Sequence, residues 1–330
     1  MDQLTAHLDR GWDLVSRGDF AGALVSARKG LEIDGESPEA HNLIGYIHAA
    51  EGNADEALDH YRQAIDLDET FVEAMLNAAE ILIHPMGDFP GALAMVEDAI
   101  ELMEEDEELA DAMLLKIDVL LHLGERDAAG QVVRALPEGP FDNGNLEFLI
   151  GRAKLEVGDI EGAEGHLAAA IEREPEHPDA HYYRGLLFEQ KGDVRGATVS
   201  FLQTREIDLH VGPPPWSMPV DQFEKKVQAA IMRLPRELRG VLDGALVVVG
   251  DVPGAEVVAD GVDPRLGVLL DAVDAEPPRA ERVFIYQHNV ERSASGMDGI
   301  EDELAASLER ELAAAFPAMR ADAKPDGEWK

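Results

Sequence analysis

The chain has 330 residues, 45% of them hydrophobic and 29% charged, which is long enough for two globular domains and excludes a wholly disordered chain. Lys and Arg total 28 against 67 Asp and Glu, and the resulting net charge of −39 excludes nucleic acids and anionic membranes as favoured partners, because their phosphates repel acidic surfaces. The absence of cysteine excludes disulfides, thiol catalysis and cysteine-ligated zinc.

Two features of the chain predict a soluble, cytoplasmic protein. The first residues lack the basic stretch followed by an apolar run that is typical of a secretory signal. The longest uncharged apolar runs, such as residues 245–249, are far shorter than the roughly 20 residues that a bilayer-spanning helix needs.

An internal repeat occupies the first two thirds of the chain. A glycine before a polar or charged residue recurs at intervals of 34, 35, 37, 34 and 34 residues, and an alanine follows each glycine five positions later. The apolar residues between these marks have helical spacing, so each repeat is predicted to be a helix, a tight turn and a second helix. The six turn glycines are Gly18, Gly52, Gly87, Gly124, Gly158 and Gly192.

These residues, together with phrases such as Gly52-Asn53-Ala54-Asp55-Glu56-Ala57, resemble the tetratricopeptide repeat (TPR) family over residues 4–209. The resemblance implies an α-solenoid of about six helix-turn-helix repeats, a superhelix whose concave face binds peptides or proteins. It also implies that the first helix of each repeat faces this groove. The groove residues expected on that basis are Leu8, Trp12, Asn42, Tyr46, Phe148, Arg152 and Tyr182.

The character of these groove residues indicates the class of partner. The lysines with which some relatives bind acidic chaperone tails are missing, while aromatic side chains suit an apolar or helical segment, and the net charge suits a basic one. Packing between repeats is an equally weighted alternative for some of these side chains.

Three histidines occupy the same repeat position and are interpreted as packing residues: His7, His41 and His181. The pair His177 and His181 is interpreted as a weak metal site, because Pro178 begins a helix between the two histidines.

The composition changes after residue 210. Residues 211–219 form a proline-rich linker, and residues 220–330 are predicted to form a small α+β domain with a disordered C-terminal tail. The expected elements are helices at 220–234 and 238–242, strands at 245–249 and 282–288, and a final helix at 300–316.

The order of these elements and the phrases Leu234-Pro235, Ala245-Leu246-Val247-Val248-Val249 and Arg282-Val283-Phe284-Ile285-Tyr286 resemble small bacterial zincin-like metallopeptidases. In that family the last helix carries HExxH, whose two histidines bind zinc. Here Glu311 keeps the place of the glutamate, but Arg310 and Ala314 replace the histidines, and neither can ligate zinc. The resemblance also implies a further acidic ligand shortly after Phe316, but Ala318, Met319 and Arg320 stand there instead, with Asp322 slightly displaced.

The favoured function is therefore a protein-interaction scaffold or adaptor that carries a catalytically inactive zincin-like domain, with no metal and no cofactor. Glu311 is interpreted either as a relic of the catalytic residue or as an ordinary glutamate at the edge of an apolar stripe. The main alternative is a metal-dependent hydrolase with a non-standard zinc site, in which His288, Glu311 and Asp322 are the ligands to test. In a third, purely structural interpretation the C-terminal domain caps the last repeat.

Overall fold

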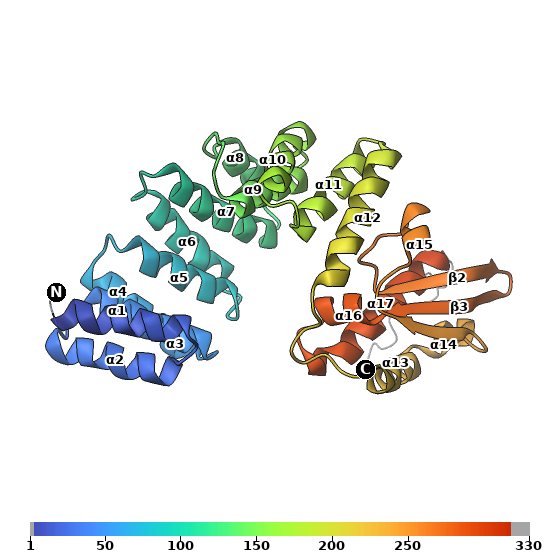
Figure 1. Cartoon of the computed structure of the whole chain (residues 1–330), viewed down its shortest axis with the longest axis horizontal. Helices are drawn as coiled ribbons and strands as arrows, with labels where there is room; N and C mark the ends of the chain where they lie inside the picture. Colours follow the sequence, from blue (N-terminus) through green and yellow to red (C-terminus); the bar gives the residue numbers. More distant parts are fainter. Residues whose placement is uncertain (1–2, 318–330) are drawn as a thin grey trace, which may run out of the picture. The chain divides into compact units, whose positions relative to one another are not determined.

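The structure, a computed structural model, describes residues 3–317 and divides the chain into two compact units, Met1–Pro175 and Glu176–Lys330. The first unit holds five helix pairs, and the sixth pair lies in the second unit together with the α+β domain (Figure 1). The repeat period ends near residue 210, as the sequence indicates, but the compact packing divides the chain earlier, between residues 175 and 176. The last pair packs with the C-terminal residues, as described below.

Consecutive helices of the first unit (blue to green in Figure 1) pair as hairpins. They are α1 (Gln3–Ser16), α2 (Phe20–Ile33), α3 (Pro38–Ala50), α4 (Ala54–Leu67), α5 (Val72–Ile83), α6 (Phe89–Ile100), α7 (Asp106–His122), α8 (Arg126–Arg134), α9 (Gly144–Glu156) and α10 (Ile160–Arg173). No helix in residues 3–317 combines the length and the apolar character that crossing a bilayer requires.

The turn glycines take the conformation that the repeat pattern predicts. All six have φ between 67° and 89°, the left-handed region in which a side chain is strained. Four of them precede an aspartate that caps the next helix. At the first, Asp19 accepts a hydrogen bond from the backbone N–H of Gly22 at 2.9 Å, which satisfies one free donor of the helix end.

Small residues allow the paired helices to approach closely. The six alanines that follow the turns by five residues are buried, five of them completely. Gly45 lies so near the partner helix that a Cβ atom there would stand 2.7 Å from the ring of Tyr61. The predicted helix-turn-helix pairs are therefore confirmed, and the repeated small residues are explained by helix packing.

The second unit contains the sixth pair and a three-stranded sheet with its helices (Figure 1). Its elements are α11 (Pro178–Gln190), α12 (Val194–His210), α13 (Val220–Arg233), α14 (Arg236–Val241), β1 (Leu246–Gly250), α15 (Ala255–Ala259), β2 (Val268–Ala275), β3 (Pro278–Tyr286), α16 (Gln287–Ser293), the 3-10 helix Met297–Gly299 and α17 (Ile300–Ala315). The strand order is β1-β3-β2, with β1 parallel and β2 antiparallel to β3. Residues of α13, α14, α17 and the sheet share one core.

Two sequence expectations for this sheet were wrong. The strand β2 was not expected, because it includes the charged Asp271 and Asp274 and lies at the edge of the sheet, where only part of it is buried. The strand expected at 282–288 begins earlier and ends at Tyr286, so His288 belongs to α16. The expected disordered tail lies outside the described residues.

Candidate functional site

The predicted groove surface of the first unit has an aromatic pair at its N-terminal end. The helices α1, α3 and α5 are neighbours in the structure, as the first helices of successive repeats should be. Trp12 on α1 and Tyr46 on α3 meet edge to face, with ring centroids 5.1 Å apart. Tyr46 is 40% exposed, while Leu8 and Trp12 are half-buried. An exposed aromatic ring supported by a second one is suited to contact an apolar segment.

The other predicted groove residues of this unit differ in exposure. Asn42 is buried, donates to Glu73 Oε1 at 3.0 Å and accepts from Asn77 Nδ2 at 3.0 Å, so it joins α3 to α5. Phe148 is buried, and Arg152 is half-buried with its Nε 3.6 Å from Glu156 Oε1. Their contact with a partner stays a prediction.

Tyr182, the last predicted groove residue, is already in contact with the C-terminal part of its own unit. Its hydroxyl donates to Asp263 Oδ2 at 2.8 Å, and the guanidinium of Arg265 lies over its ring, 4.6 Å from the centroid. Burial, with the nearby carboxylate of Asp263, raises the pKa of Tyr182 above its usual value. In this state the loop that carries Asp263 and Arg265 occupies the surface of α11 around Tyr182.

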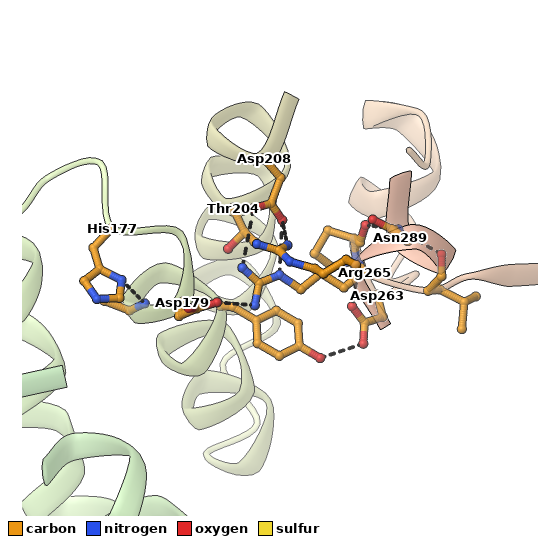
Figure 2. Close-up of polar contacts among 12 residues, drawn as sticks. His177, Asp179, Thr204, Asp208, Asp263, Arg265 and Asn289 are labelled. Atoms are coloured by element: carbon orange, nitrogen blue, oxygen red, sulfur yellow. Dashed lines mark hydrogen bonds and ion pairs between the residues drawn. The ribbon is translucent and has the colours of Figure 1, made fainter. Parts of the chain in front are cut away.

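Arg265 is the centre of a charged cluster that joins both helices of the last pair to this loop (Figure 2). Its Nη1 lies 2.6 Å from Asp179 on α11, and its Nε lies 3.1 Å from Asp208 on α12. Asp208 is only 1% exposed and accepts a second charged bond from Arg292 Nη1 at 2.6 Å. Burial alone would lower the pKa of Arg265, but the two carboxylates outweigh it and raise that pKa.

Neighbouring contacts hold the loop in place. Asn289 on α16 donates from its amide to the carbonyl oxygens of Pro264 and Leu266, both at 2.9 Å (Figure 2). On the other side, Val258 of α15 packs with Ala197 and Phe201 of α12. The last helix pair and the α+β domain are therefore joined by buried charges, hydrogen bonds and apolar packing.

The histidines that the sequence analysis singled out differ in their surroundings. His177 is the N-cap of α11 and accepts from the N–H of Ala180 at 3.2 Å, while His181 is buried and accepts from Arg184 Nη2 at 3.1 Å. His7 is half-buried. His41 is different, because its Nδ1 lies 3.0 Å from Nδ1 of His60. Within residues 3–317, no three or more His, Asp or Glu side chains form a group that could hold a metal.

The positions that correspond to the zincin motif lie on α17. Arg310 is exposed and donates to Ser307 Oγ at 2.9 Å, and Ala314 is exposed. Glu311 is half-buried, and this burial raises the pKa of its carboxyl group. His288 lies on α16, where its backbone N–H donates to the carbonyl of Asp251. The segment in which the family's further acidic ligand would fall lies outside the described residues, and it includes Ala318, Met319, Arg320 and Asp322.

Sequence reasoning missed the cluster around Arg265 and the pair His41–His60. One signal for the first was present: Ser200, Thr204 and Asp208 form a polar stripe, four residues apart, along the buried face of α12. A buried carboxylate on such a stripe needs a charged partner. Nothing in the local sequence of the loop identifies Arg265 as that partner.

Comparisons with known proteins identify the repeats. A family model for the tetratricopeptide repeat matches residues 8–70 and 148–203. The chain is 28% identical over 160 residues to the photosystem I assembly protein Ycf3 of Cyanophora paradoxa, covering 46% of this chain and 78% of that protein. It is 27% identical over 151 residues to Ycf3 of Rippkaea orientalis, covering 44% of this chain and 75% of that protein.

Two solved structures share the fold. One, from a functional characterization of PilF of Pseudomonas aeruginosa, has a TM-score of 0.54 and 17% identity, covering 63% of this chain and 93% of that one. The other, PilW, described as a type IV pilus biogenesis factor, also has a TM-score of 0.54, with 15% identity and coverage of 63% and 94%. At these identities the likeness concerns the fold alone.

Proposed function

We propose that this tetratricopeptide repeat protein is a scaffold whose groove holds a segment of a partner protein. The observation that carries the proposal is the pair Trp12–Tyr46 on two neighbouring first helices, where Tyr46 offers an exposed aromatic ring. Such rings are frequent anchors of protein interfaces. The partner segment is apolar or helical on the side that meets these rings, and it carries basic residues that suit a chain with a net charge of −39.

The curated relatives support this class of role. They are named photosystem I assembly proteins. We propose for this chain only the general role of a binding scaffold, and we do not propose that it binds the partners of these relatives. The cytoplasmic location expected from the sequence is part of the same proposal.

A selection from a phage-displayed random peptide library tests the groove. Peptides selected on the full chain should bind at least tenfold more weakly to the variant Tyr46→Glu, since a charge there removes an aromatic anchor. Val25→Glu is the matched control, because Val25 is an exposed apolar residue on the second helix of the first repeat, away from the predicted groove helices. Peptides that lose affinity equally in both variants, or in neither, would refute the groove.

We further propose that the α+β domain is a zincin-like domain without peptidase activity. The proposal is supported by Arg310 and Ala314, which stand at the two ligand positions around Glu311 and offer zinc no lone pair at neutral pH. The domain then serves as a cap of the last repeat, a role supported by the buried charges around Arg265.

Metal content separates this proposal from the metal-dependent hydrolase. The purified, untagged chain is dialysed against trace zinc and measured by mass spectrometry, and cleavage of a quenched fluorescent peptide library is followed in parallel. We expect no stoichiometric ion and no cleavage. One bound zinc per chain, with cleavage that Glu311→Gln abolishes, would establish the hydrolase instead.

A further inference from the structure

Three histidines gather on the second repeat, the hairpin of α3 and α4. The Nδ1 atoms of His41 on α3 and His60 on α4 lie 3.0 Å apart. The ring of His48, about two turns along α3 from His41, is nearly parallel to that of His60, with an interplanar angle of 8° and centroids 5.8 Å apart. The Nδ1 atom of His48 is buried and has no hydrogen-bond partner within the described residues.

The geometry of His41 and His60 is that of a hydrogen bond between two imidazoles. Their ring centroids are 5.3 Å apart while the nitrogens are 3.0 Å apart, so the two rings point at each other almost end to end. A metal ion would instead require both lone pairs to converge on a point beside the line between the nitrogens. The pair needs one Nδ1 with a proton and one without.

This arrangement limits how many protons the pair can hold. A first added proton can sit on an outer nitrogen and leave the bond intact. When both rings are charged, both Nδ1 atoms carry protons that face each other across 3.0 Å, and the bond becomes a repulsion. Full protonation of His41 and His60 is therefore incompatible with the closed hairpin.

The surroundings of the pair favour the neutral rings. Burial, then the neighbouring His41 and His48, lower the pKa of His60 to about 4, with Arg28 on α2 acting in the same direction and Asp59 on α4 opposing it. Burial also lowers the pKa of His41, against a hydrogen bond to the backbone of Gly35. These are the charged and titratable groups that act on the pair.

We propose that the second repeat is an acid-sensitive element of the groove, which opens when His41 and His60 take up protons that the closed hairpin cannot hold. The opened hairpin is favoured as the pH falls because its histidines are free to protonate. The helix α3 also carries Asn42 and Tyr46, so its opening disturbs the predicted groove surface. That consequence, release of a bound partner, rests on the proposed function.

Hydrogen exchange measured by mass spectrometry tests the opening without any partner. A histidine with a pKa of 6.5 when open and about 4 when closed makes opening about tenfold more favourable at pH 5.5 than at pH 7.5. After correction for the intrinsic exchange rate, protection of α3 and α4 amides should fall about tenfold. Both pH values lie above the isoelectric point of about 4.4, where the chain keeps its negative charge.

The control variants separate this histidine pair from general acid effects. His60→Gln keeps a hydrogen-bonding side chain but cannot titrate, so its α3–α4 protection should change much less between the two pH values than that of the parent chain, by the contribution of His41 alone. His122→Gln, on α7, should behave like the parent chain. His41→Gln is the second variant should His60→Gln prove unfolded by circular dichroism. Equal pH dependence in the parent chain and in the folded glutamine variant would overturn the proposal.

The link to the groove has its own readout. With Trp216→Phe and Trp329→Phe, Trp12 is the only tryptophan of the chain, and its contact with Tyr46 makes its emission a reporter of the predicted groove surface. Its emission should change from pH 7.5 to 5.5, and His60→Gln should strongly reduce the change. If the emission of Trp12 stays constant while hydrogen exchange shows the expected opening, the opening does not reach the predicted groove surface. Failure of the peptide selection would refute the groove and leave the exchange result standing.

Discussion

Replacing Arg265 by alanine should strongly destabilise the second unit. The change removes one of the two charged partners of Asp208, whose carboxylate is 1% exposed and 3.1 Å from Arg265 Nε. A buried ion pair that loses one partner costs about 3–5 kcal/mol, because the other charge is left without compensation. Arg292 still donates to Asp208 at 2.6 Å, so we expect the lower end, about 3 kcal/mol.

The other contacts of Arg265 add less. Asp179 is 43% exposed in its side chain, and an ion pair with such a carboxylate contributes under about 1 kcal/mol. The contact of the guanidinium with the ring of Tyr182 contributes about 1 kcal/mol. These contributions are not additive, and a total loss of about 3–4 kcal/mol in the free energy of unfolding is expected.

In chains that carry Trp12→Phe and Trp329→Phe, Trp216 is the only tryptophan, and it packs against the core of the second unit. Urea unfolding followed by its fluorescence measures this loss. With a slope of about 2 kcal/mol per molar urea, the midpoint should fall by about 1.5–2 M. The control is Arg279→Ala, because Arg279 pairs with Asp274 and Glu281 at an exposed position and should cost under about 1 kcal/mol. If both variants shift the midpoint equally, the buried cluster does not stabilise the unit.

Three further changes test the packing. A chain that ends at His210 lacks Val258, which covers α12. It should bind a hydrophobic dye and unfold at a lower urea concentration than the full chain, because apolar surface of the last repeat is exposed. Unchanged unfolding of the last repeat would contradict the proposal that the C-terminal domain is a cap. Gly52→Ala should cost about 1 kcal/mol in thermal unfolding because its φ is 80°, whereas Gly165→Ala, inside α10 with open space around it, should be neutral or stabilising. Glu311→Gln should stabilise the second unit at pH 7, because the raised pKa means that ionisation of the folded carboxyl is unfavourable; this gain should vanish below pH 4.5, where the glutamate is neutral in both states.

The two edge strands of the C-terminal domain show where sequence patterns are sufficient and where they are not. The strand β1 was predicted to within one residue at each end, because a short β-branched apolar run closed by a glycine is typical of a strand. The expectation that this strand is buried was wrong, since β1 lies at an edge of the sheet, where Leu246 is exposed and the other residues are half-buried. The edge strand β2 was missed, because its acidic residues hide the alternation that identifies a strand. The zincin-like identity of the domain stays a proposal that rests on a few phrases of the sequence.

Some contacts of the candidate sites could likewise be predicted from the sequence, and others could not. Trp12 and Tyr46 could be placed on one surface because their positions in the repeat are related by the repeat period, which links sequence directly to space. Tyr182 has the same kind of position, yet its contacts with Asp263 and Arg265 involve residues 81 and 83 positions later in the chain. Repeat arithmetic contains no information about a loop from another domain.

The sequence by itself determined the helix pairs, their turns and their close packing, because a glycine in a left-handed turn and an alanine five residues later act within one hairpin. Only the tertiary structure decided that Arg265 meets Asp208 and Asp179, which are 57 and 86 residues away, and that His41 meets His60 end to end. Such meetings depend on how elements fold onto one another, and the buried charges acquire their partners only when the chain has closed around them.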